Sequence, residues 1–278
     1  MRYMFLRFPG GKDKAVTMSY DDGPSSDEKM LEIINKYGMK CTFNYMSNQA
    51  ISSDKIKQLL IDKGHEIAVH GSNHRAPGAV RAIDGIADVL QCRKDLEKKF
   101  NRIIRGMAYP DSGIRTFHNC ASYENIRNYL VDLGIVYSRT LGEDNNSFLL
   151  PTDWYRWMPT AHHNNPKLME YVKEFVKLDV GSKYTASRYP RLFYLWGHSF
   201  EFDRDNNWEL LEDFCKAISN KDDIWYATNI EICEYVKAYN SLVFSADSSI
   251  IYNPTLKTVW FDVDTQQFKM ESGEEIRL

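Results

Sequence analysis

Residues 15–38 read AVTMSYDDGPSSDEKMLEIINKYG, and this stretch predicts one β-strand followed by one α-helix. Ala15–Tyr20 is a short run of mainly apolar and β-branched residues, as expected of a buried strand. A helix is predicted from Ser26, a favourable N-cap, to Gly38, which stands where glycine commonly ends a helix. The stretch therefore has the form of a βα unit.

The same alternation recurs along the chain and predicts seven βα units around a mainly parallel sheet. The predicted strands are Ala15–Tyr20, Lys40–Tyr45, His65–Val69, Ile103–Ala108, Ile135–Arg139, Leu192–Trp196 and Ile224–Thr228. The predicted helices lie near Ser26–Gly38, Ser53–Lys63, Ala79–Phe100, Tyr123–Leu133, Lys167–Leu178, Trp208–Ile218 and Ile230–Tyr239. The fold class is therefore α/β.

Two segments depart from this alternation. Leu141–Pro166 is rich in Trp, Pro, Asn and His, and we interpret it as an ordered insertion beside the functional site, because long irregular loops are often functional. After Ser241, period-two segments separated by turn residues predict two or three antiparallel strands. We therefore expect a barrel domain over residues 1–240 and a small β-strand extension over residues 241–278 that packs on it.

Composition argues against several classes of protein. The 278 residues carry a formal net charge of -3, so no surplus of positive charge favours nucleic acid or an anionic membrane as a partner. No apolar run approaches the roughly 20 residues that span a bilayer, and the N-terminus lacks the apolar core of a signal peptide. We therefore expect a cytoplasmic protein. Five cysteines without a CxxC pair argue against a structural zinc knuckle or a disulfide framework.

Ionisable side chains follow several of the predicted strands at the point where each strand ends. Asp21 and Asp22 follow the first strand, His70 and His74 follow the third, and His198 follows the sixth. Tyr109 likewise follows the fourth strand. In a parallel α/β barrel these residues share the face at the carboxyl ends of the strands, where active sites are built. Residues far apart in the sequence are thus expected to converge there.

Each of these motifs has a plain structural interpretation when taken alone. Two aspartates before a glycine and a proline fit an ordinary turn, and a histidine pair with H-x-x-x-H spacing fits an ordinary surface. Adjacent carboxylates repel each other unless a cation or a proton lies between them. A carboxylate from the first strand together with His70 and His74 makes an Asp/His/His set, which leaves an open position for water at a metal ion. His198 either caps its strand or acts as a proton donor.

Four other histidines are assigned no role in catalysis, and one of them, His118, lies in a predicted loop without partners. His65 begins its predicted strand, so it is expected at the opposite end of the barrel from His70, where it has a structural role. His162 and His163 close the insertion. They fit contact with substrate or a second ion, but a solvated loop pair is the favoured interpretation.

Four segments, TMSYDDGP (17–24), GHEIAVHGSNH (64–74), RGMAYP (105–110) and FYLWGH (193–198), resemble in their order the polysaccharide deacetylase family. This is carbohydrate esterase family four, or the NodB-homology domain. The resemblance covers Ala15 to Tyr239 and implies a distorted (β/α)7 barrel, in agreement with the seven units found independently. The small C-terminal β appendage lies outside it.

The resemblance also implies roles for individual residues. Asp21 matches the family's general base, and Asp22, His70 and His74 match its metal ligands. His198 matches the general acid, with one extra residue between Leu195 and the histidine. The implied cofactor is one divalent ion, with zinc expected and cobalt, nickel, manganese or iron as alternatives.

Other roles implied by the resemblance rest on less regular motifs. The third motif spreads its arginine and proline apart and reverses the order of tyrosine and proline. Arg105 is expected to orient Asp21, and Tyr109 to flank the oxyanion site, although ion pairing and aromatic packing explain these two residues equally well. Asp153 is expected to tune His198, while Trp154 and Leu195 are expected to contact the sugar.

The sequence therefore favours a metal-dependent hydrolase that removes N-acetyl groups, or O-acetyl groups, from an amino sugar, oligosaccharide or polysaccharide. Its expected partner is an acetylated saccharide. Two alternatives remain open at this point. One is hydrolysis of a non-sugar amide on the same fold, and the other is a carbohydrate-binding relative with little or no turnover.

Overall fold

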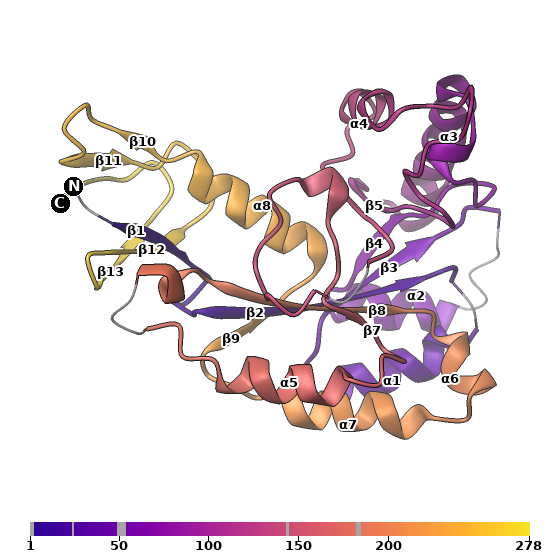
Figure 1. Cartoon of the computed structure of the whole chain (residues 1–278), viewed down its shortest axis with the longest axis horizontal. Coiled ribbons are helices and arrows are strands. Elements are labelled where there is room, and N and C mark those ends of the chain that lie inside the picture. The colour runs from indigo at the N-terminus through magenta and orange to yellow at the C-terminus, as the bar shows by residue number, and fades with distance from the viewer. Residues whose placement is uncertain (1–2, 24, 49–53, 143–144, 182–184) are drawn as a thin grey trace.

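The computed structural model describes residues 3–23, 25–48, 54–142, 145–181 and 185–278. A parallel sheet forms its centre, with strand order β6-β5-β4-β3-β2-β8-β7, and β9 pairs with the start of β2 (Figure 1). These strands are β2 (Lys14–Asp21), β3 (Cys41–Tyr45), β4 (Glu66–Val69), β5 (Gly106–Ala108), β6 (Tyr137–Arg139), β7 (Ala161–His162), β8 (Arg191–Gly197) and β9 (Ile224–Tyr226). The α/β fold class is confirmed, and each of the seven predicted strands has a counterpart, although several bounds differ.

Helices connect the strands and cover the sheet. They are α1 (Asp27–Lys36), α2 (Asp54–Asp62), α3 (Ala82–Phe100), α4 (Tyr123–Asp132), α5 (Leu168–Lys177), α6 (Phe200–Arg204), α7 (Trp208–Ile218) and α8 (Asn229–Asn240). Figure 1 shows α1, α5 and α7 side by side below the sheet and α8 above it. Each predicted helix has its counterpart, although Ser53, the predicted start of the second helix, lies outside the described residues.

The predicted insertion links the two ends of the curled sheet. Trp157 forms a parallel bridge to Arg139 of β6, and the Trp157 N–H donates to the Ser138 carbonyl over 3.1 Å. A few residues later β7 pairs with β8. Residues 157–162 thus lie between β6 and β8, which completes the barrel beside the site. Positions 143–144 of this insertion lie outside the described residues.

The fourth strand begins later than predicted. β5 starts at Gly106, whereas the prediction started at Ile103, whose side chain is 80% exposed. The apolar character of Ile103 and Ile104 resembles that of a strand, but β5 hydrogen-bonds to β6 only from Gly106 onwards. Arg105 therefore lies at the amino end of the strand.

The C-terminal residues form two small antiparallel sheets. One has the order β1-β12-β13 and the other β10-β11-β14. The strands are β1 (Met4–Arg7), β10 (Val243–Phe244), β11 (Ile250–Tyr252), β12 (Val259–Val263), β13 (Gln266–Met270) and β14 (Glu275–Arg277). β1 was not predicted; it pairs with β12, so the N-terminal strand joins the C-terminal sheets.

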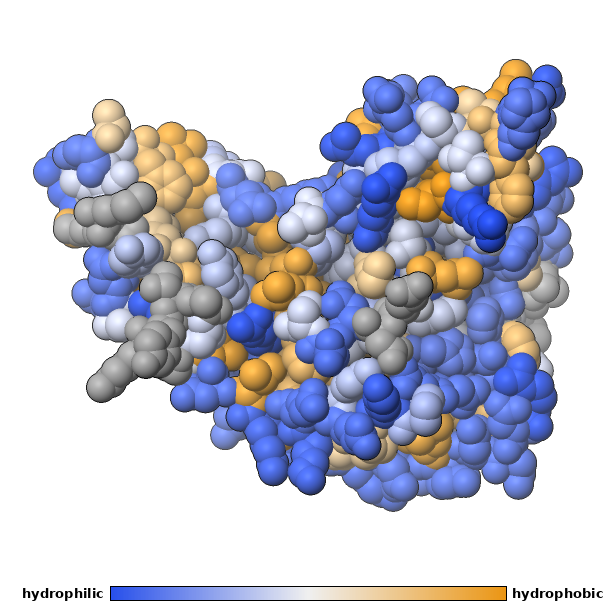
Figure 2. Space-filling view, viewed as in Figure 1, coloured by the Kyte–Doolittle hydropathy of each residue, from blue (hydrophilic) through white to orange (hydrophobic). Residues whose placement is uncertain are grey.

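These two sheets, which we call the C-terminal lobe, lie away from the carboxyl ends of the barrel strands. In Figure 1 the lobe is at the left, whereas α1 and α6, which follow β2 and β8, are at the right. Buried residues of β11, β12 and β13 pack against Ala238 at the end of α8 and Leu242 just beyond it. The surface of the lobe includes exposed Val243, Phe244 and Tyr252, and hydrophobic surface is visible there in Figure 2.

None of the helices formed by the described residues is both long and apolar enough to cross a membrane.

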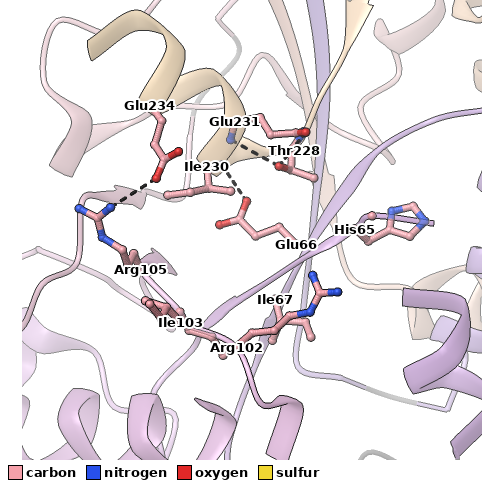
Figure 3. Close-up of a pocket in the computed structure, with 12 residues that line it drawn as sticks. His65, Glu66, Ile67, Arg102, Ile103, Arg105, Thr228, Ile230, Glu231 and Glu234 are labelled. Carbon is pink, nitrogen blue, oxygen red and sulfur yellow. Dashed lines mark hydrogen bonds and ion pairs between the residues drawn. The ribbon is translucent and has the colours of Figure 1, made fainter. Parts of the chain in front are cut away.

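Glu66 is a buried carboxyl at the amino end of β4 (Figure 3). It accepts hydrogen bonds from Thr42 Oγ1 at 2.7 Å, the Tyr137 hydroxyl at 2.7 Å and the Ile230 N–H at 2.8 Å. Glu66 therefore links β4 to β3, to β6 and to the first turn of α8. Burial raises the pKa of Glu66 to about 7, although these hydrogen bonds oppose the rise.

This pKa makes the stability of the fold depend on pH. The ordinary pKa of a glutamate is 4.5. Between pH 4.5 and about pH 7 the folded protein therefore holds the Glu66 proton more tightly than the unfolded chain does. Its contribution to the free energy of unfolding is therefore present below pH 4.5 and is lost as pH rises through 7. We expect Glu66→Gln to remove this decline, which amounts to about 3 kcal/mol. Urea unfolding of both proteins from pH 4 to 8 measures it, and parallel stability curves would contradict it.

Candidate active site

The carboxyl end of β2 carries the two adjacent aspartates. Asp21 is the last residue of the strand and is buried, and Asp22 follows with a φ of 77°. A positive φ is strained for a residue with a side chain, and such strain concentrates at functional sites. Gly23 has a φ of 74°, and a Cβ at this position would lie 2.6 Å from the Tyr45 ring. The turn therefore requires glycine here.

His70 and His74 face Asp22 from the turn that follows β4. The Nε2 atom of each ring lies 3.5 Å from Asp22 Oδ1, and the three possible ligand atoms all lie within 4.8 Å of one another. Atoms bound tetrahedrally to one ion at about 2 Å lie about 3.3 Å apart. The spacing of Asp22, His70 and His74 therefore suits a single divalent ion.

Two further observations fit a metal site. His70 Nδ1 lies 2.9 Å from the Ala108 carbonyl oxygen, which only accepts, so Nδ1 carries the proton and Nε2 is free to bind an ion. Asp22 Oδ1 is buried and has no hydrogen-bond partner among the described residues. An unpaired buried carboxylate oxygen is costly, and a cation would relieve that cost.

Asp88 of α3 fixes the turn that carries the two histidines. Its carboxylate accepts from the Ser72 N–H at 3.1 Å, the Asn73 N–H at 2.9 Å and the Asn73 side-chain amide at 2.8 Å. The residue lies within α3 and not at a strand end, so no sequence motif pointed to it. The positions of His70 and His74 therefore depend on a carboxylate from a different element.

Asp21 is held by two partners that sequence analysis missed. The buried Arg139 guanidinium, at the end of β6, donates to Asp21 Oδ2, and the Asn44 amide donates to Asp21 Oδ1 at 2.8 Å. Burial favours the neutral acid, but Arg139, the nearby histidines and Asn44 outweigh it and lower the pKa of Asp21. Asp21 is therefore an ionised carboxylate beside the candidate metal site.

The prediction that Arg105 orients Asp21 is wrong. Arg105 lies at the amino end of β5 and pairs with Glu234 of α8 at 3.3 Å (Figure 3). Both residues line a pocket of about 490 Å³ at the opposite end of the barrel. His65 lines the same pocket: its Nδ1 accepts from the Cys41 N–H at 3.1 Å, and burial lowers its pKa to about 4. The structural role expected for His65 fits these contacts.

His198 approaches the other carboxylate oxygen of Asp22. Its Nε2 is 3.9 Å from Asp22 Oδ2, and its Nδ1 is 3.4 Å from Glu201 Oε2. Burial opposes the charged imidazole, but Glu201, Asp21 and Asp22 outweigh it and raise the pKa of His198. The proton-donor role implied by the family resemblance requires such a charged form.

The prediction that Asp153 tunes His198 is wrong. Asp153 caps a 3-10 turn, η2 (Trp154–Arg156), by accepting from the Tyr155 N–H at 2.9 Å, and it also accepts from the Tyr123 hydroxyl. The hydrogen-bond partners of the Asp153 carboxylate are thus Tyr155 and Tyr123, and His198 is not among them. Glu201 occupies the position next to His198, because the turn that leads into α6 brings the two residues together and the Glu201 N–H donates to the His198 carbonyl at 3.1 Å.

His162 and His163 are not a solvated loop pair, because His163 is only 1% exposed and both rings face Glu201. Together with Glu201 they form a second group with metal-ligand spacing. Its chemistry does not suit a metal. His162 Nδ1 accepts from the Asn164 N–H at 3.1 Å, so in the neutral ring Nε2 carries the proton and has no lone pair for an ion. His70 has the opposite tautomer, which suits ligation.

Three residues expected to contact substrate are placed elsewhere. The Tyr109 hydroxyl donates to the Tyr155 carbonyl at 3.0 Å, and its N–H donates to the Arg139 carbonyl at 2.9 Å, so neither is free to flank an oxyanion. Trp154 packs edge to face on Trp157, with ring centroids 4.9 Å apart. Leu195 is fully buried, because strand alternation in β8 turns it into the main hydrophobic core.

Other aromatic rings surround His198 instead. Trp196 follows Leu195 and points to the opposite face of β8. Its ring centroid lies 6.0 Å from that of His198, and the Arg139 guanidinium lies over the Trp196 ring. Phe200 lies 5.3 Å from His198 and is 37% exposed. These rings, rather than Trp154 and Leu195, form the walls beside the proton donor.

Residues 9–137 match the family model described as polysaccharide deacetylase. Among solved structures, the chain is similar to a protein of Mycobacterium smegmatis assigned to the polysaccharide deacetylases, with a TM-score of 0.58, 17% identity and coverage of 84% of this chain and 94% of the other. A protein of Pseudomonas aeruginosa PAO1 with the same assignment has a TM-score of 0.59, 13% identity and coverages of 82% and 92%. The Puue allantoinase has a TM-score of 0.58, 12% identity and coverages of 82% and 91%.

At these identities the solved structures establish the fold, which is the distorted (β/α)7 barrel. The family-model match adds the sequence relationship. The sequence of residues 9–137 matches the polysaccharide deacetylase family, and the resemblance inferred from the four motifs is confirmed.

We predict that the protein binds one divalent ion per chain. His70→Ala is expected to abolish binding, whereas His162→Ala is expected to retain it, because only His70 has the tautomer that leaves Nε2 free. Elemental analysis after chelation and reloading with zinc measures the content of each protein. Two ions per wild-type chain, or loss of the ion in His162→Ala, would contradict the assignment.

Asp88→Asn is expected to weaken metal binding about 10- to 100-fold. The two carboxylate oxygens of Asp88 accept from the Ser72 N–H and the Asn73 N–H, whereas an amide has only one oxygen that accepts. Asp84→Asn, an exchange in the first turn of the same helix, serves as the matched control. Competition with a chromophoric chelator measures the affinity. Equal affinities for the two variants would show that Asp88 does not hold the ligands.

Proposed function

We propose that the protein is a metal-dependent hydrolase that removes acetyl groups from the nitrogen of an amino sugar or short oligosaccharide. The observation that carries the proposal is the convergence at one strand edge of an ionised carboxylate, an Asp/His/His set and a third histidine. Asp21 Oδ2 lies 4.0 Å from His70 Nε2 and His198 Nε2 lies 3.9 Å from Asp22 Oδ2, so a base and an acid both lie next to the ligand set.

Asp22, His70 and His74 would hold the ion. A divalent ion bound in this way supplies a water of lowered pKa and a Lewis acid for the acetyl carbonyl. Asp21 Oδ2 lies 4.0 Å from His70 Nε2, close enough to take a proton from a water at the ligand set. Arg139 and Asn44 keep the Asp21 carboxylate ionised and prevent it from turning away.

His198 completes the reaction. The oxygen of the attacking water forms the new bond to the acetyl carbon, and the bond from that carbon to nitrogen breaks. His198 Nε2, which faces Asp22, donates its proton to the departing nitrogen. Acetate and a free amine are the products, and the proton taken by Asp21 balances the one given by His198.

A second candidate is hydrolysis of a non-sugar cyclic amide, which the similarity in fold to an allantoinase favours. The same base, ligands and acid serve both reactions. A saccharide-binding protein without turnover would not need the base and acid, so their convergence supports an enzyme. The matching family and the exposed Phe200 ring, a surface on which a sugar can stack, support the saccharide.

We expect Asp21→Asn to lower turnover at least about 100-fold without loss of the metal ion, because Asp21 serves as base and is not a ligand. Asp22→Asn is expected to lose the ion. Acetate release from an N-acetylchitooligosaccharide series and ring opening of cyclic amides, each with and without a chelator, measure turnover. Loss of metal in Asp21→Asn would show that the two aspartates have exchanged roles, and chelator-insensitive turnover would contradict the proposal.

A further inference from the structure

Three histidines surround one oxygen of Glu201. His162 Nε2 lies 3.0 Å from Glu201 Oε2, and His163 Nε2 and His198 Nδ1 each lie 3.4 Å from it. The three rings come from two places, the end of β7 and the end of β8, and Glu201 comes from α6. The carboxylate thus joins the segment that completes the barrel to the loop that carries His198.

Glu201 is itself held in place by His162. Because the Asn164 N–H donates to His162 Nδ1, the neutral ring must carry its proton on Nε2, which then donates to Glu201 at 3.0 Å. Arg204 lies 3.5 Å from the other carboxylate oxygen. The Glu201 side chain is therefore held from two sides and cannot turn away from His198.

The backbone beside His198 is held as well. The Ser199 hydroxyl donates to the buried Asp27 carboxylate at 2.6 Å, and the Tyr45 hydroxyl donates to the same carboxylate at 2.9 Å. The position of the loop thus depends on α1 and β3. With the backbone held, the His198 ring can move only by rotation about its own side-chain bonds. Glu201, 3.4 Å from Nδ1, limits that rotation.

We infer that Glu201, anchored by His162, is the positioning residue for His198, an inference that rests on the proposed function. Glu201 directs the Nδ1 proton of the imidazolium toward itself, so that Nε2 points to the departing nitrogen. The separation of 3.4 Å is longer than a good hydrogen bond, and such contacts in free enzymes tighten when substrate binds. Glu201 thereby takes the role that the sequence motifs suggested for Asp153.

A leaving group that needs no proton distinguishes this role from a structural one. An amine leaves an acetyl group only when it is protonated, whereas 4-nitrophenolate leaves as the anion. We expect Glu201→Gln to lower kcat for an N-acetylchitooligosaccharide about 100-fold with little change in KM. The same variant is expected to hydrolyse 4-nitrophenyl acetate within about twofold of the wild-type rate and to retain the ion.

Asp203→Asn is the matched control, because Asp203 lies two residues after Glu201 on α6. Its carboxylate bonds to Ser26 and Trp208 and not to the histidines. It is expected to leave both reactions unchanged. Adding Glu201→Gln to His198→Ala is expected to cause no further loss on the amide substrate, since the two residues act as a unit.

Equal losses on the two substrates in Glu201→Gln would overturn the inference and indicate a structural role, as would wild-type activity on both or a further loss in the double variant. Thermal unfolding of each variant separates misfolding from loss of positioning. A wild-type protein that hydrolyses neither substrate would overturn the proposed function itself, and with it this role for Glu201.

Discussion

The site depends on the register of the parallel strands. Asp21 pairs with Asn44, Tyr45 pairs with Val69, and Tyr20 pairs with Gly197, so β2, β3, β4 and β8 end at one edge. The next residues along the chain leave the sheet there, which brings Asp22, His70 and His198 together. A slip of one residue in any of these pairings would turn the side chains of that strand to the opposite face. The hydrophobic core on both faces of β2 therefore also fixes the position of the ligand set.

The second requirement is that charges at this edge are paired. Asp21 and Arg139 are both buried, and each would be costly to bury without the other. Removal of one partner from such a pair typically costs about 3–5 kcal/mol, because the remaining charge has neither water nor a partner. Glu201 and its histidines form a similar group beside Asp22. Base and acid are thus positioned by separate networks, and both lie next to the ligand set.

Much of this arrangement could be predicted from the sequence, because strand ends are visible as the places where an apolar run gives way to polar residues. That rule places Asp21, Asp22, His70, His74 and His198 on one face. Applied to every strand, it would also have identified Arg139, which ends the fifth strand, and Asn44, which lies one residue before the end of the second. It fails for Asp88, which lies in mid-helix, where nothing in the local pattern distinguishes a buried carboxylate from a solvated one.

The errors have physical causes of the same kind. Arg105 was assigned to the site from its motif, although it precedes its strand, as His65 does, and residues at amino ends lie on the opposite face of the barrel. Leu195 lies on the correct strand, β8, but its side chain points into the hydrophobic core, on the opposite face of the strand from Trp196. Glu201 was missed because its proximity to His198 depends on a helix of five residues, and its proximity to His162 depends on how the insertion crosses the barrel.

Every proposed role at this site requires that Asp22, His70 and His74 bind one ion. X-ray absorption at the zinc edge of the reloaded protein tests this most directly, because imidazole and carboxylate ligands give distinct scattering. We expect two imidazole nitrogens and carboxylate or water oxygens at about 2.0–2.2 Å, with one imidazole lost in His74→Ala. A spectrum without imidazole ligands, or one that His74→Ala leaves unchanged, would contradict it.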